Sequence, residues 1–81
     1  MSHILVVNGR YVIGFGYLGK PPTRQLSDNE LAITPEEYII FESNPKQRKY
    51  TPHFTHISLL RWQRLILKHH PTYKVYIEER M

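Results

Sequence analysis

The sequence contains no cysteine and no long uninterrupted apolar run. Without cysteine the chain can form neither a disulfide framework nor a thiolate metal site, which is compatible with a reducing compartment. The longest apolar-rich segment, residues 57–67, is interrupted by Arg61, Gln63 and Arg64, so it cannot span a bilayer. The first residues lack the basic region and the apolar length of a signal peptide. We therefore expect a cytoplasmic protein without a membrane partner.

The sequence also lacks a set of residues that fits a known kind of catalysis. The acidic pairs at positions 36–37 and 78–79 are adjacent, and neighbours on a strand face opposite sides, so neither pair converges on one atom. No serine stands in the strand–turn–helix context of a nucleophile elbow. His53 and His56 form an H-x-x-H pattern, but no carboxylate or cysteine is fixed beside them. We predict no enzymatic activity, no metal site and no cofactor.

The length of 81 residues predicts a single domain over residues 1–81. The hydrophobic fraction of 41% is that of a folded globular chain, which argues against wholesale disorder. Eleven basic and seven acidic residues give a net charge of +4. This balance favours acidic or polyanionic partners.

The clearest local signal is Asn8-Gly9 between two β-favouring runs. This pair suits a two-residue hairpin turn, because both central residues of the turn need positive φ. Strict alternation along the second strand would place four bulky side chains on one face: Tyr11, Ile13, Phe15 and Tyr17. The other face would carry Val12, Gly14, Gly16 and Leu18. The chain thus begins with a β-ribbon that has one aromatic face.

Residues 20–43 contain patterns that favour different structures. Residues 20–32 are polar and contain prolines, which predicts an irregular loop. Thr34 and Glu37, with Pro35 between them, fit the start of a helix. However, residues 38–41 are an unbroken β-favouring run that is too short for a helix. We favour a strand over 37–42 and keep the helix over 34–43 as the alternative.

The strongest helix signal covers residues 56–69, with Thr55 as its N-cap and Pro71 beyond its end. Its apolar residues fill a broad arc, and Arg61, Arg64 and Lys68 share the remaining face. Residues 73–79 then alternate as a closing strand. We therefore predict an α+β fold: a small, largely antiparallel sheet of three or four strands packed on one main helix.

The layout consists of residues 8–17, the run 38–43, the helix and the closing strand 73–79. In this layout the chain resembles small accessory proteins encoded by bacteriophages and prophages. Members of this broad class include inhibitors of host enzymes and host defences. The resemblance implies a viral inhibitor that acts by binding a host protein rather than by catalysis.

One helix can cover only one face of a sheet, so the other face is free to bind a host protein or a second copy of the chain. Tyrosine is enriched at such interfaces. The candidate partner-binding residues are therefore Tyr11, Phe15, Tyr17 and Tyr76.

Two alternatives stay open. The first is direct nucleic-acid binding by a basic surface made of Lys46, Arg48, Lys49, Arg61, Arg64 and Lys68. The second is a small ligand or nucleotide that lies against the backbone of Gly14 and Gly16, since residues 14–19 match G-x-G-x-x-G. No helix opens after that pattern, which favours glycines that serve strand packing.

Overall fold

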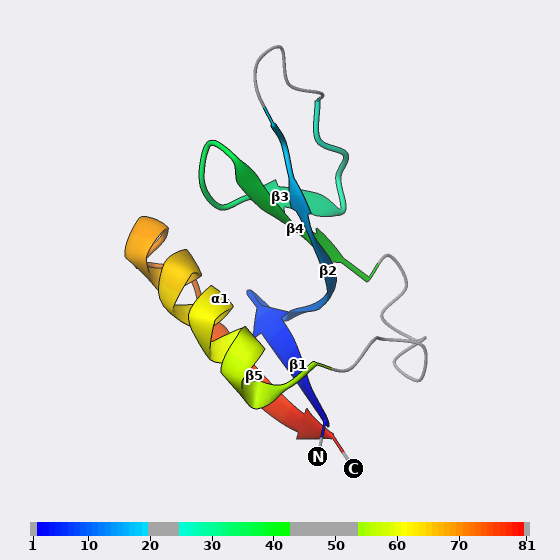
Figure 1. Ribbon diagram of the computed structural model, residues 1–81, viewed down its shortest axis with the longest axis vertical. Coiled ribbons are helices and arrows are strands. Elements are labelled where there is room, and N and C mark those ends of the chain that lie inside the picture. Colours follow the sequence, from blue (N-terminus) through cyan, green and yellow to red (C-terminus); the bar gives the residue numbers. More distant parts are fainter. Residues whose placement is uncertain (1, 20–24, 43–53, 81) are drawn as a thin grey trace.

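The computed structural model describes residues 2–19, 25–42 and 54–80 (Figure 1). In chain order its elements are β1 (Ser2–Val7), β2 (Arg10–Tyr17), β3 (Glu30–Ala32), β4 (Glu37–Phe41), α1 (His56–His69) and β5 (Val75–Arg80). Across these ranges the strands form one antiparallel sheet in the order β3-β4-β2-β1-β5, and α1 lies beside β1 and β5. The α+β class with one main helix is confirmed.

The hairpin signal at Asn8-Gly9 is also confirmed. Both residues have positive φ, 51° and 82°, and they join Val7 to its partner Arg10. The Asn8 side chain accepts a hydrogen bond from the Lys74 amide at 2.9 Å, and the Asn8 amide donates to the Lys74 carbonyl at 2.8 Å. The turn is therefore tied to the start of β5.

The conflict over residues 34–43 resolves in favour of the strand, because β4 covers Glu37–Phe41. The Thr34 hydroxyl accepts hydrogen bonds from the amides of Glu36 and Glu37, at 3.2 and 2.9 Å. Thr34 thus closes a tight turn between β3 and β4 instead of capping a helix.

The expected irregular loop over 20–32 contains a short strand that the sequence did not reveal. Its three residues pair with β4, Glu30 opposite Ile40 and Ala32 opposite Tyr38. Three residues are too few to show an alternating pattern, so this strand is defined by its pairing with β4 across the turn at 33–36. The described sheet therefore has five strands rather than three or four.

A β-bulge in β2 overturns the expected alternation of its side chains. Val12 pairs with Phe41 and Gly14 pairs with Ile40, so Ile13 is an extra residue without a partner in β4. An extra residue shifts the pleat, so Val12 before it and Phe15 after it both face the same layer of core. Tyr11, Ile13, Phe15 and Tyr17 do not share one face.

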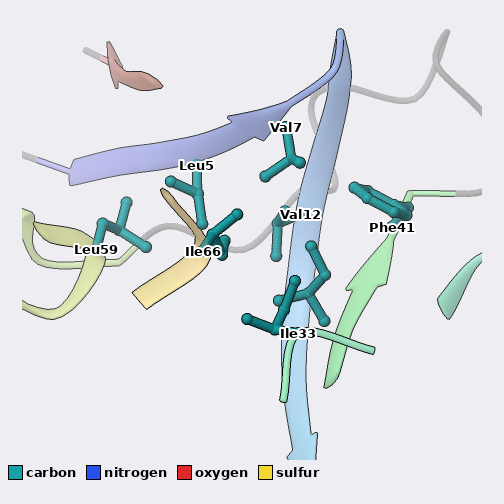
Figure 2. Packing of buried hydrophobic residues seen from close by; sticks show 8 residues of the cluster. Leu5, Val7, Val12, Ile33, Phe41, Leu59 and Ile66 are labelled. Atoms are coloured by element: carbon teal, nitrogen blue, oxygen red, sulfur yellow. The ribbon is translucent and has the colours of Figure 1, made fainter. Parts of the chain in front are cut away.

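The bulge also bends β2 away from β1. The two strands pair only near their turn, Val6 with Tyr11 and Val7 with Arg10, and they then cross at a steep angle (Figure 2). Phe54 takes the place that β2 leaves beside β1. Its amide donates to the His3 carbonyl at 2.8 Å, and its carbonyl accepts from the His3 amide at 2.9 Å.

The core lies between this bent sheet and α1. Figure 2 shows side chains converging from β1, β2, β4 and the helix. The buried cluster consists of Leu5, Val7, Val12, Ile33, Ile39, Phe41, Leu59 and Ile66. Leu59 and Ile66 are fully buried, and their seven-residue spacing keeps them on one side of α1. The helix is thereby held with a fixed outer face.

The sheet face opposite α1 is not open along β1, contrary to our expectation. Leu5 and Val7 point toward the helix, so the alternating residues Ile4 and Val6 point away from it. Ile4 is nevertheless 0% exposed and Val6 only 2% exposed. This part of the far face is already covered within one molecule.

Gly16 gives a direct test of the sheet register. It pairs with Tyr38, and a methyl group on Gly16 would overlap the tyrosine ring. We expect Gly16→Ala to lower the free energy of unfolding by about 1–3 kcal/mol, as overpacking does. In a Tyr38→Ala background, Gly16→Ala should instead raise the free energy of unfolding by about 0.5–1 kcal/mol, because alanine suits a strand better than glycine. Chemical denaturation of the four variants measures both values.

Gly14→Ala is the matched control, because a methyl group there meets Ile40 at an ordinary 3.5 Å. We expect this variant to be tolerated. Equal losses of stability at Gly14 and Gly16 in the wild-type background would contradict the register.

Candidate binding surface

The candidate aromatic residues are separated by the bulge. Only Tyr11 and Tyr76 come together, because both are in register with Val6 on the sheet face opposite α1. Tyr76 is 51% exposed and Tyr11 is half-buried. Whether this pair binds a partner stays a prediction.

Phe15 is half-buried between the sheet and α1. Its ring stacks on Trp62 of α1 with centroids 4.3 Å apart and meets Phe54 edge-on at 5.3 Å. It packs against the buried core cluster. Phe15 is therefore part of the sheet–helix interface and does not share a surface with Tyr11 and Tyr76.

Tyr17 lies at the far end of β2, with 66% of its surface exposed. Its hydroxyl donates a hydrogen bond to the Glu36 carboxylate at 3.2 Å. The negative charge of Glu36 and this hydrogen bond raise the pKa of Tyr17 above the ordinary value of 10.0, with a smaller contribution from Glu37. Tyr17 thus belongs to an acidic corner of the molecule, away from Tyr11 and Tyr76.

Side chains of β4 lie close to both glycines of β2. The Ile40 side chain lies beside Gly14, and the Tyr38 ring lies over Gly16. A strand rather than a helix contains this pattern. These contacts favour glycines that serve close packing between β2 and β4, and a ligand on Gly14 and Gly16 stays a prediction.

The histidines are dispersed among structural contacts. The His56 ring lies 5.0 Å from the ring of His3. His70 stacks on Tyr73 with centroids 4.5 Å apart, and one of its ring nitrogens lies 3.2 Å from the Ile33 carbonyl oxygen. His53 lies outside the described residues. Among the residues that are described, no three histidine, aspartate or glutamate side chains gather as a metal site would require.

The outer face of α1 brings together three of the predicted site residues on one surface. Thr55 caps the helix, its hydroxyl accepting from the Ser58 amide, and Leu59 and Ile66 anchor the inner side. At 100° per residue, four residues lie within about 40° of the direction opposite that anchor. These residues, which we call the outer row, are Ile57, Arg61, Arg64 and Lys68.

The three cations of the outer row are exposed and have no internal partners. Neither a hydrogen bond nor an ion pair joins Arg61, Arg64 or Lys68 to any residue in the described ranges. The helix contains no acidic residue, and His69 follows Lys68 in its last turn. The outer row therefore presents uncompensated positive charge. The other proposed cations, Lys46, Arg48 and Lys49, lie outside the described residues.

Ile57 is the residue of this surface that the sequence reasoning missed. It is 81% exposed, and it continues the row of cations one turn toward the N-terminus. The spacing of four residues from Ile57 to Arg61 was visible in the sequence. That Ile57 is exposed beside the cations follows from which side of α1 packs on the sheet, and only the structure shows that side.

Comparison with protein-family models, with curated proteins and with solved structures gives no match to this chain. Within the described ranges, α1 is too short and too polar to cross a membrane.

Substitutions of Phe15 and Tyr17 test whether Phe15 is packed in the core and Tyr17 is exposed. Phe15→Ala removes a stacked, half-buried ring, and we expect a loss of about 3–5 kcal/mol in the free energy of unfolding. That is the whole stability of a typical chain of this size. Tyr17→Ala should leave the unfolding midpoint nearly unchanged, because the ring is mostly in solvent. A tolerated Phe15→Ala, measured by chemical denaturation, would show that Phe15 lies on an open surface.

The contact between Tyr17 and Glu36 predicts a pH effect. A raised pKa means that folding favours the protonated phenol, so its contribution to stability is present below pH 10 and is lost as the pH rises through the folded-state pKa. An NMR titration of the tyrosine ring carbons should show Tyr17 ionising above 10.0. Glu36→Gln should shift its ionisation back toward that value, whereas Glu79→Gln should not. An unshifted Tyr17 would contradict the contact.

Proposed function

We propose that this protein is a non-enzymatic binding protein that attaches to an acidic partner through the outer row of α1. The observation that supports the proposal is the alignment of Arg61, Arg64 and Lys68 on one exposed helix face, without partners among the described residues. Three aligned charges attract an anionic surface and orient it during the encounter. The absence of acidic residues from α1 leaves this attraction undiminished.

The rigidity of α1 strengthens this proposal. Leu59, Trp62 and Ile66 hold the helix on the sheet, and Thr55 fixes its first turn. Side chains on a helix anchored in this way lose less freedom on binding than side chains on a loop. Binding through this face would occupy a partner surface, which is how an inhibitor of a host protein acts.

The same cations support nucleic-acid binding, the alternative that the basic composition suggests. The two partner classes differ in their response to salt. A duplex that contacts three cations should lose affinity with a slope of about −2.7 in a plot of log K against log salt. An acidic protein surface carries fewer condensed counterions and should give a shallower slope.

Charge reversal within the outer row tests the proposal. We expect Arg64→Glu to weaken binding to a labelled oligoglutamate peptide by about tenfold, because it turns an attraction into a repulsion. Fluorescence anisotropy measures the affinity, and a labelled DNA duplex measured in parallel shows which class of polyanion is preferred.

Lys74→Glu is the matched control, because Lys74 is exposed beside the hairpin turn and its reversal changes the net charge by the same amount. It should leave the affinity close to that of the wild type. Equal losses from Arg64→Glu and Lys74→Glu would show that only net charge matters, and no binding to either probe would overturn the proposal.

A further inference from the structure

We infer that the outer face of α1 docks an acidic, amphipathic helix of a partner protein, an inference that rests on the function proposed above. The first observation is an apolar stripe along the cations. Ile57, Leu60 and Leu67 stand at positions i, i+3 and i+10, with Arg64 at i+7. This is the spacing with which two helices meet along a shared seam.

The exposure of these residues shows that the stripe is available. Ile57 is 81% exposed, Leu67 is 36% exposed, and Leu60 is half-buried at its edge. None of the three belongs to the buried core or to the side chains packed against it. Their apolar surface is therefore free to gain from burial against a partner.

The charges along the stripe specify the partner. Arg61 follows Leu60 and Lys68 follows Leu67, so each cation flanks an apolar position on the same side. In paired helices, charges at such flanking positions select a partner of opposite sign. Arg64 lies within the seam and needs a carboxylate opposite it. A helix with leucine-like residues on its seam and glutamates beside them meets all of these requirements.

A second copy of α1 is a poor occupant of this face. An isologous dimer would bring the same patch of both copies together. Arg61, Arg64 and Lys68 would then lie against the cations of the second copy, and α1 carries no acidic residue to compensate them. Charge complementarity thus favours a different, acidic protein.

Nucleic acid also fits this face less well. A phosphate backbone offers ionic contacts but little apolar surface for Ile57 and Leu67. Base stacking uses aromatic side chains, and the exposed tyrosines of the described structure, Tyr17 and Tyr76, stand on β2 and β5 instead. The outer row spans eleven residue steps, about 17 Å of helix. A contact of this length is small, so we expect a micromolar dissociation constant.

Two labelled peptides of equal composition test this inference on the full chain. The first is a designed helix with leucine at its seam positions and glutamate beside them. The second has the same residues in an order that scatters the leucines around the helix. We expect the protein to bind the first peptide in the micromolar range and the second at least tenfold more weakly, by fluorescence anisotropy. Circular dichroism should show an increase in helix when the first peptide binds.

Ile57→Asn is the decisive variant, since its side chain is exposed and its loss should not unfold the domain, which thermal unfolding checks. It should weaken binding to the first peptide by about tenfold and leave binding to the scrambled peptide unchanged. Ala32→Asn is the matched control and should bind like the wild type, because Ala32 is an exposed residue of β3, at the opposite edge of the sheet from β5 and α1.

The outcomes separate this inference from the proposed function. Equal binding of both peptides, or a preference for a DNA duplex, with the binding lost in Arg64→Glu, would leave the proposed function in place and overturn the docked helix. An unaffected Ile57→Asn would overturn it as well. No binding to either peptide or to the duplex would overturn both.

Discussion

β2 holds one residue more than β4 can pair with, and the position of that residue determines how the sheet meets the helix. Val12 pairs with Phe41, Gly14 with Ile40, and Ile13 stands between them without a partner. The extra residue turns Phe15 toward α1, where its ring stacks on Trp62. It also bends β2 away from β1, so that Phe54 can pair with His3 and lead into the helix. The bulge thus connects strand register, core packing and helix placement.

This placement decides which surfaces remain for recognition. With Phe15 beneath the helix, the aromatic residues of the ribbon no longer form one patch, and Ile4 and Val6 on the far face are covered. The fully buried anchors of α1, Leu59 and Ile66, direct its cations outward. The strongest candidate for binding therefore moves from the sheet to the helix. We propose that the protein acts through this surface and its charge.

The sequence predicted those features that depend on neighbouring residues. Asn8-Gly9 determines its own turn, and Thr55 with the apolar period determines α1 and the side on which Arg61 lies. β3 could not be predicted, because its three residues are too few to show an alternating pattern. The bulge could not be predicted, because it arises from the pairing of β2 with β4, which is remote from β2 in the chain. For the same reason Phe15 was placed on the wrong surface. The cations of the site were found by helical period, whereas the exposure of Ile57 depends on how α1 packs.

The account depends most directly on the contact between the rings of Phe15 and Trp62. A nuclear Overhauser spectrum of the protein measures this contact, together with the cross-strand neighbours of Ile13. The account predicts strong signals between the two rings, signals that join Gly14 to Ile40 across the strands, and no cross-strand partner in β4 for Ile13. An unbroken ladder through Ile13, with Phe15 close to Tyr11 and distant from Trp62, would contradict it.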